Sequence, residues 1–278
     1  MLFRYTLIVI IYMFSSNLSA QYVDLISYNI RLDIESDKEN KWDNRKYFLA
    51  KQLKYHEPDI FGIQEGLHHQ VEFIDSFLSE YSYTGVGRKN GKEEGEYCAV
   101  FYNNNTVKMI SGSTFWLSET PGEPSMGWDA AYIRICTYAV FEILESGKKV
   151  LVFNAHFDNS GEKSRKESAK LILDKSAEIN KEGYPVVLLG DMNFEPETEV
   201  YNYLHKYLND TKKVSDFVFG PQGTFNAFDF CEPVKRRIDY IFADKEAISV
   251  LKYAVLSDSR NKRYPSDHLP VYARVRVR

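Results

Sequence analysis

Polar side chains that can do chemistry repeatedly follow short apolar runs in this sequence of 278 residues. In six places, a polar motif built from Asp, Asn, Glu or His stands at the end of a run that is typical of a β-strand, or in a turn beside one. Because the strands of an α/β sheet bring their ends to one edge, we expect these side chains to meet there. The residues concerned are Asn29, Glu65, His156, Asp191, Asn193, Asp239, Asp267 and His268.

The residue types indicate a site for a hard divalent cation. Carboxylate and amide oxygens with two imidazoles suit Mg²⁺, Mn²⁺ or Ca²⁺ better than a soft metal. Cleaving a phosphate ester requires a water that is deprotonated and aimed, stabilisation of the added negative charge, and neutralisation of the leaving oxygen. The set of carboxylates, amides and imidazoles holds candidates for each of these tasks.

The elements that must position these residues alternate along the chain. Apolar runs and turn residues predict strands at 23–30, 60–64, 96–102, 132–143, 150–155, 185–190, 237–243, 247–257 and 271–277. Helical spacing of apolar residues predicts helices at 42–56, 67–78, 162–180 and 197–208, the first capped by Asp43 or Asn44. A loop is expected around 114–129. Alternating strands and helices with hairpin-like pairs among them fit two mixed sheets packed face to face, with helices outside.

Taken in order, the motifs resemble those of the endonuclease/exonuclease/phosphatase superfamily, which includes deoxyribonucleases, sphingomyelinases, inositol polyphosphate phosphatases and deadenylases. Each motif alone is common, but all six in this order, each beside a strand signal, argue against chance. The resemblance runs from about Val23 to Val277. It implies an α/β fold, a four-layer αββα sandwich of two mixed β-sheets flanked by helices, and hydrolysis of a phosphate ester with Mg²⁺, Mn²⁺ or Ca²⁺. The motifs are Tyr28-Asn29-Ile30-Arg31, Gln64-Glu65, Asn154-Ala155-His156, Gly190-Asp191-Met192-Asn193, Arg237-Ile238-Asp239 and Ser266-Asp267-His268.

The resemblance also implies roles for the metal and water. Glu65 corresponds to the main metal ligand of the family, with Asn29 and Asp267 beside it. Asp191 corresponds to the residue that orients the attacking water or holds metal, and Asn193 to one that binds the phosphate.

The two imidazoles receive separate roles from the same resemblance. His268 resembles a base or phosphate ligand held by the carboxylate of Asp239, which would orient the ring and raise its basicity. His156 corresponds to a histidine that contacts the phosphate or protonates the leaving group in deoxyribonuclease-like members. Glu96 aligns with an acid that orients this histidine, although a surface acid at a strand edge explains Glu96 nearly as well.

Three further residues are predicted to bind substrate. Arg134 stands where many members keep an arginine that packs under the site. Trp128 lies in a loop whose flanking segments, 114–121 and 127–131, resemble a bacterial, often exported branch of the superfamily. Its ring could stack on a base or sugar, or plug the edge of the core. Arg237 precedes the run that contains Asp239.

The first 20 residues have the layout of a secretory signal peptide. Arg4 is the one charge, an apolar run covers 6–14, and small polar residues lead to Ala20. We therefore expect cleavage before Gln21, one domain over 21–278, and export to the periplasm or the medium. The apolar run is too short to span a bilayer, so no stable membrane anchor is expected.

The net charge narrows the classes of substrate that the protein can bind. A net charge of −4 and a pI of about 5.9 count against a polynucleotide substrate, because such binders are usually basic. A nuclease stays open as an alternative, since a metal can supply positive charge locally. A non-catalytic phosphate-binding protein is a second alternative, disfavoured because every motif position is filled. An exported protein could pair two of its three cysteines, Cys98, Cys136 and Cys231, but their apolar surroundings favour buried free thiols.

Overall fold

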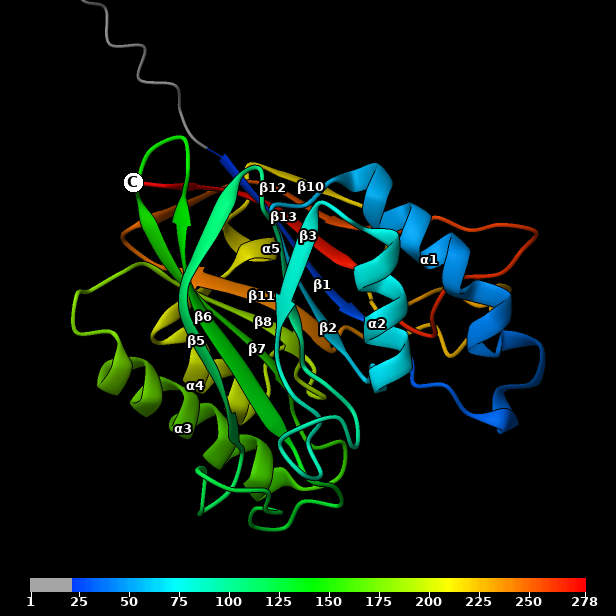
Figure 1. Ribbon diagram of the computed structural model, residues 1–278, viewed down its shortest axis with the longest axis horizontal. Coiled ribbons are helices and arrows are strands. Elements are labelled where there is room, and N and C mark those ends of the chain that lie inside the picture. Colours follow the sequence, from blue (N-terminus) through cyan, green and yellow to red (C-terminus); the bar gives the residue numbers. More distant parts are fainter. Residues whose placement is uncertain (1–21) are drawn as a thin grey trace, which may run out of the picture.

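Two mixed β-sheets packed face to face form the centre of the molecule (Figure 1). The structure, a computed structural model, describes residues 22–278, and the predicted leader lies outside them. The first sheet has the strand order β10-β12-β13-β1-β2-β4-β3 and the second β5-β6-β7-β8-β11-β9. The strands are β1 (Tyr22–Asn29), β2 (Ile60–Gln64), β3 (Tyr81–Thr84), β4 (Val100–Asn103), β5 (Val107–Trp116), β6 (Ile135–Ile143), β7 (Lys149–His156), β8 (Val186–Asp191), β9 (Leu208–Asp210), β10 (Phe217–Phe219), β11 (Asp239–Asp244), β12 (Ile248–Val255) and β13 (Val271–Val277).

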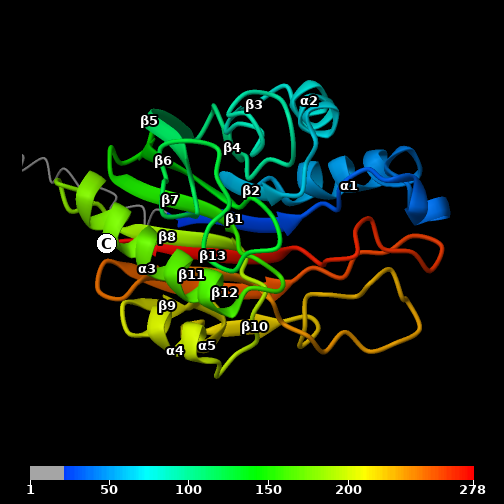
Figure 2. The ribbon, with the colours of Figure 1, turned by 90° about the horizontal axis from the view of Figure 1, so that it is seen from below.

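Helices cover the outer face of each sheet (Figure 2). The helices are α1 (Trp42–His56), α2 (His68–Phe77), α3 (Glu162–Ile179), α4 (Glu199–His205), α5 (Thr211–Val214) and the 3₁₀ helix η1 (Glu35–Asn40). Apolar residues of α1 and α2 pack on the first sheet, and those of α3 and α4 pack on the second. This arrangement confirms the four-layer sandwich predicted from the sequence.

Strand alternation explains how one segment serves two layers. In β1, Val23 and Leu25 point into the core between the sheets, whereas Ile26 and Tyr28 point toward the helices. Both faces of this strand are buried, so apolar residues occur on both of them and do not alternate regularly with polar ones. The same holds for β8, which begins at Val186 and ends in the polar residue Asp191.

Several predicted boundaries were wrong where packing depends on distant segments. Strand β5 covers the first part of the expected loop and pairs with β6 along its length. It lies at the edge of its sheet and its middle is mostly exposed, so it carries little hydrophobic signal. The predicted strand at 96–102 begins only at Val100, and the one at 132–143 begins at Ile135. Helix α1 starts after Lys41 without a side-chain cap, so neither Asp43 nor Asn44 caps it.

Two cysteines behave as expected and one does not. Cys98 and Cys136 are buried free thiols, but Cys231 is exposed in the loop before β11. Across residues 22–278, none of the helices has the length and apolar character needed to cross a bilayer.

Candidate active site

Strand register brings three of the predicted residues into one row. Strands β7, β8 and β11 are adjacent, and His156 and Asp239 both lie opposite Asp191 across the two pairings. Gly190, just before Asp191, has a φ of +148°, and a Cβ there would lie 1.9 Å from the Ala155 carbonyl oxygen. Glycine is therefore required for the strands to approach this closely at the site.

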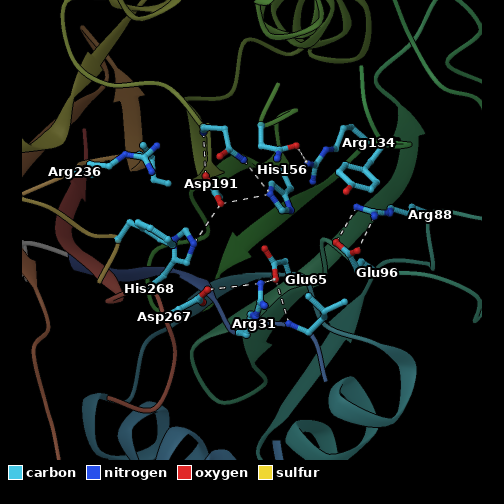
Figure 3. Close-up of a pocket in the computed structure, with 16 residues that line it drawn as sticks. Arg31, Glu65, Arg88, Glu96, Arg134, His156, Asp191, Arg236, Asp267 and His268 are labelled. Atoms are coloured by element: carbon cyan, nitrogen blue, oxygen red, sulfur yellow. Dashed lines mark hydrogen bonds and ion pairs between the residues drawn. The ribbon is translucent and has the colours of Figure 1, made fainter. Parts of the chain in front are cut away.

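A polar cavity of about 490 Å³ opens above this row and collects most of the predicted residues (Figure 3). The predicted residues that line it are Glu65, Glu96, Arg134, His156, Asp191, Asn193, Asp267 and His268. Glu65 and Asn193 have left-handed backbones, with φ of 65° and 48°. Non-glycine residues in this region cost on the order of 1 kcal/mol each, and such strain is concentrated at functional sites.

His268 and Asp239 form the coupled pair that the sequence predicted. His268 Nδ1 lies 2.9 Å from Asp239 Oδ2 and 3.1 Å from Oδ1, and both residues are buried. This contact directs Nε2 toward Asp191, whose Oδ2 lies 3.8 Å away. Burial alone would lower the pKa of His268, but Asp239 and Asp191 outweigh it and raise the pKa to about 10. The ring is thus a cation that can bind a phosphate oxygen.

Asn29 holds two carboxylates together at the end of β1. Its Nδ2 donates to Glu65 Oε1 at 2.9 Å and to Asp191 Oδ2 at 3.0 Å. Its Oδ1 accepts from the backbone N–H of Arg31 at 3.0 Å. Arg31 Nη1 in turn faces Glu65 Oε2 at 3.9 Å and Asp267 Oδ2 at 3.8 Å. In this arrangement Asn29 orients acidic groups that can hold a cation.

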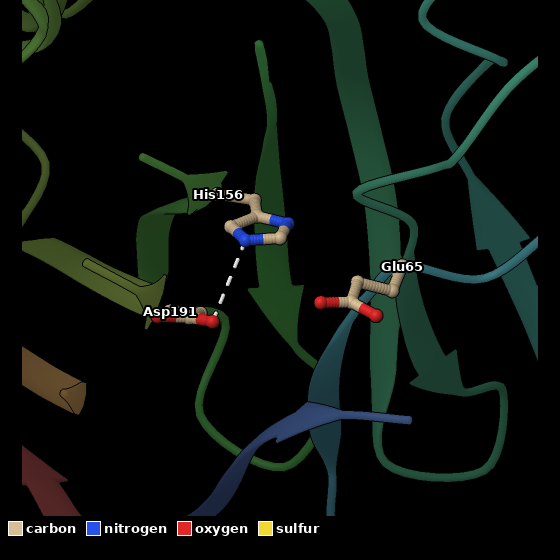
Figure 4. A group of neighbouring side chains, drawn as sticks. All are labelled: Glu65, His156 and Asp191. Carbon is tan, nitrogen blue, oxygen red and sulfur yellow. Dashed lines mark ion pairs between the residues drawn. The ribbon is translucent and has the colours of Figure 1, made fainter. Parts of the chain in front are cut away.

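The donor set fits a hard divalent metal. Donor atoms of Glu65, His156 and Asp191 lie within 4.8 Å of one another (Figure 4). Asp191, Asp239 and His268 lie equally close together, but the protonated His268 ring has no free nitrogen to offer a metal. Burial, and then repulsion from Asp239, raises the pKa of Asp191 to about 7. Mg²⁺-like ions prefer oxygen ligands, and closely spaced carboxylates supply them.

His156 lies beside Asn193, the residue for which the sequence predicted a role in binding the phosphate. Asn193 Nδ2 lies 3.2 Å from His156 Nε2 and donates to the Phe157 carbonyl at 3.0 Å. His156 Nε2 also lies 3.4 Å from Asp191 Oδ2. Burial, followed by the charges of Arg134 and Arg88, holds the pKa of His156 well below its usual range. The ring is therefore neutral and can donate or accept a hydrogen bond.

Glu96 does not take the orienting role predicted for it. Its carboxylate pairs with the Arg88 guanidinium through two contacts, Nη1–Oε2 at 2.8 Å and Nη2–Oε1 at 2.6 Å. The pair lines the cavity on the side of His156 and Arg134 (Figure 3). The sequence missed this because Arg88 lies in a loop and carries no motif.

Arg134 lines the cavity as predicted, but Trp128 lies elsewhere. Arg134 is fixed by Asp158 Oδ2 and Asn159 Oδ1, each at 3.2 Å. Trp128 is outside the set of cavity residues, and its backbone N–H bonds to the Glu119 carboxylate. The aromatic rings that line the cavity are those of Tyr132, four residues later, and Phe225.

Arg237 is buried in the core instead of binding substrate. Its guanidinium meets both oxygens of Asp210, at 3.1 and 2.6 Å, and lies 4.5 Å from the centre of the Tyr240 ring. Its neighbour Arg236 lines the cavity. Adjacent residues of an extended segment point to opposite sides, which explains why Arg236 lines the cavity and Arg237 does not.

We expect Arg237→Ala to lower the free energy of unfolding by about 3–5 kcal/mol, because it leaves the buried Asp210 carboxylate unpaired. Arg237→Met combined with Asp210→Asn should cost less, since no charge remains alone. Arg236→Ala, at an exposed arginine next in sequence, should stay within about 0.5 kcal/mol of the wild type. Urea unfolding measures all three. Equal effects at positions 236 and 237 would contradict this assignment.

Other cavity residues were missed by the sequence predictions. They are Arg31, Leu32, Arg88, Tyr132, Asn159, Phe225, Arg236 and Ile238. Arg31 could have been found, because it stands two residues after Asn29 at the end of a predicted strand. The others lie in loops or in the approach to β11, where only the folded chain shows what they face.

Comparison with known proteins agrees with this geometry. The profile of the Endonuclease/Exonuclease/phosphatase family matches residues 26–268. A solved family protein from Bacteroides thetaiotaomicron is 36% identical, with a TM-score of 0.89 over 93% of this chain and 98% of that one. A mannosyl-6-phosphatase from the same organism is 37% identical, with a TM-score of 0.88 over 91% and 99% of the two chains.

One more distant relative is nocturnin. Mouse nocturnin is 24% identical over 257 residues, which cover 82% of this chain and 57% of nocturnin. The chain thus spans little more than half the length of that relative. The profile match covers most of the chain, and the polar motifs at the strand ends converge on one cavity. The chain belongs to the endonuclease/exonuclease/phosphatase family of metal-dependent hydrolases that act on phosphate esters.

Proposed function

We propose that this protein is an exported, Mg²⁺- or Mn²⁺-dependent phosphomonoesterase that removes the phosphate from a phosphorylated sugar. The observation that carries the proposal is the shape of the site, a compact cavity of about 490 Å³ with the carboxylates and imidazoles at its centre. Cavities of this size hold small ligands, whereas a polynucleotide is tracked by an extended positive groove. The likeness to the Bacteroides mannosyl-6-phosphatase over nearly the full length of both chains supports the same substrate class.

Each central residue has a task in such a hydrolysis. His268, held by Asp239, presents Nε2 to a phosphate oxygen and offsets its negative charge. Asp191 lies within 4 Å of both imidazoles, so it can align a water and accept its proton. Asn193 and His156 lie together where a phosphate or leaving oxygen can accept a hydrogen bond.

The metal adds Lewis acidity to this arrangement. A divalent cation held by Glu65 and the neighbouring oxygen ligands would polarise the phosphate and stabilise the charge that develops in the transition state. Arg31, which faces Glu65 and Asp267, balances the remaining negative charge.

A substrate panel tests the proposal. Phosphate release with Mg²⁺ or Mn²⁺ should be fastest from hexose 6-phosphates, with kcat/KM of at least about 10⁴ M⁻¹s⁻¹, the lower end for natural substrates. Bis(p-nitrophenyl) phosphate, single-stranded DNA and RNA should be far poorer. Preferred cleavage of nucleic acid would replace the proposal with the nuclease alternative. Folded, metal-loaded protein that hydrolyses none of these esters would favour the binding-protein alternative.

Export is the second part of the proposal, and it rests on the leader-like residues 1–20. Protein isolated from its native host should begin near Gln21, because signal peptidase removes the leader during secretion. N-terminal sequencing or intact mass measures this, and fractionation of the cells locates the protein. An intact Met1 on the isolated protein would contradict export by this route.

A further inference from the structure

We propose that Tyr132 and the Arg88–Glu96 pair form a subsite that binds the hydroxyl-bearing sugar ring of the leaving group. The inference rests on the proposed function and deepens it, because it assigns recognition of the sugar to residues outside the catalytic motifs. These three residues share the cavity wall beside His156 and Arg134, and Figure 3 shows Arg88 and Glu96 there, away from His268 and Asp267.

The Arg88–Glu96 pair is built into the fold. The backbone N–H of Arg88 donates to the Glu96 carbonyl at 3.1 Å, and Trp116 Nε1 donates to the Arg88 carbonyl at 2.7 Å. Only 12% of the Arg88 side chain and 15% of the Glu96 side chain are exposed. A pair fixed this well is pre-organised, so little side-chain entropy remains to be lost when a ligand binds.

The chemistry of the pair suits hydroxyl groups better than phosphate. Arg88 and Glu96 neutralise each other through two contacts, which leaves little charge to attract a dianion. Each group still offers bonding capacity, since a guanidinium carries five N–H donors and a carboxylate has about four lone-pair sites. A donor beside an acceptor matches the hydroxyls of a sugar, each of which can donate and accept.

Tyr132 supplies an apolar face for the sugar ring. It is 52% exposed at the cavity, and its ring lies 5.7 Å from the Arg88 guanidinium and 5.5 Å from that of Arg134. Its backbone is anchored, because Asp158 accepts hydrogen bonds from the N–H groups of Ala131 and Tyr132 at 3.1 and 3.2 Å. An exposed aromatic ring on a fixed backbone is a stacking surface with a polar hydroxyl at its edge.

The opposite side of the cavity lacks this order. Arg236 lines the cavity there, across from Arg88 (Figure 3). Its partner Glu195, at 3.5 Å, lies outside the cavity lining, and both side chains are 54% exposed. Exposed pairs of this kind are weak and screened by solvent. The Arg88–Glu96 side is therefore the better platform for orienting a sugar.

Two substrates with the same reacting bond isolate the subsite. Mannose 6-phosphate and n-butyl phosphate are both primary alkyl esters, but butyl phosphate has neither hydroxyls nor a ring. The readout is the ratio of their kcat/KM values, measured as released phosphate, in which any loss common to both substrates cancels. The variants are Arg88→Met with Glu96→Gln, which removes both charges together, and Tyr132→Leu.

We expect each variant to lower the ratio of the two kcat/KM values about ten- to a hundredfold, mainly by raising KM for mannose 6-phosphate. This factor corresponds to the loss of one or two hydrogen bonds to charged groups, or of a stacking surface. Tyr132→Phe keeps the ring face and should keep most of the preference. Tyr207→Leu is the matched control, since Tyr207 is 54% exposed and lies outside the cavity.

The outcomes separate the two proposals. A wild type that prefers mannose 6-phosphate, with variants that keep the ratio, would overturn the subsite alone. A wild type that hydrolyses butyl phosphate at least as well as mannose 6-phosphate and other hexose phosphates would overturn the proposed function and the subsite with it. Variants that lose both substrates equally would show that these residues only support the fold or the phosphate site.

Discussion

Replacing Glu65 by glutamine is expected to lower kcat/KM by roughly a thousandfold and to weaken the binding of Mg²⁺. Glu65 brings a carboxylate next to His156 and Asp191, within the group of donor atoms that can hold an ion. A metal acting as a Lewis acid contributes several kcal/mol to the transition state, and each 1.4 kcal/mol is a factor of about ten. Glutamine has nearly the same size, so the loss would report the charge.

Calorimetric titration with Mg²⁺ and steady-state kinetics on the best substrate of the panel measure the two effects. The matched control is Glu72→Gln on α2, outside the cavity, which should leave both values unchanged. Removing metal with EDTA should abolish the activity of the wild type, and Mg²⁺ or Mn²⁺ should restore it. Full turnover by protein shown to be metal-free would rule out this chemistry.

Replacing His268 by alanine should lower kcat by at least about a hundredfold, the usual cost of removing one fixed donor that stabilises developing negative charge. The variant loses the ring that faces Asp191 and leaves the buried Asp239 without its partner at 2.9 Å. Asp239→Asn should cost less than the loss of the ring, because the amide oxygen can still accept a hydrogen bond from Nδ1 and keep the imidazole in place.

Folding must be checked beside activity, since both residues are buried at strand ends. Circular dichroism and thermal unfolding establish whether each variant is native. His205→Ala is the control, because its ring packs on Tyr201 in α4 and lies outside the cavity. Turnover close to wild type in folded His268→Ala would show that the family chemistry does not apply to this residue.

The sequence by itself determined the layers of the fold and the centre of the site. Runs that are buried on both faces, such as those of β1 and β8, are mostly apolar, so they are visible without knowing their neighbours. The polar residues that stop them stand out for the same reason. His156 and Asp191, which end their strands, and Asp239, which begins β11, could therefore be found in advance, and the register of the three strands brings them together.

Only the tertiary structure decided which polar residues face the cavity away from the strand ends. Arg236 and Arg237 are adjacent and chemically alike, yet one lines the cavity and the other pairs with Asp210 in the core. Glu96 likewise meets Arg88, and Tyr132 takes the place predicted for Trp128. A loop residue has no periodicity to fix its direction, so its partner is set by contacts with segments far away in the sequence.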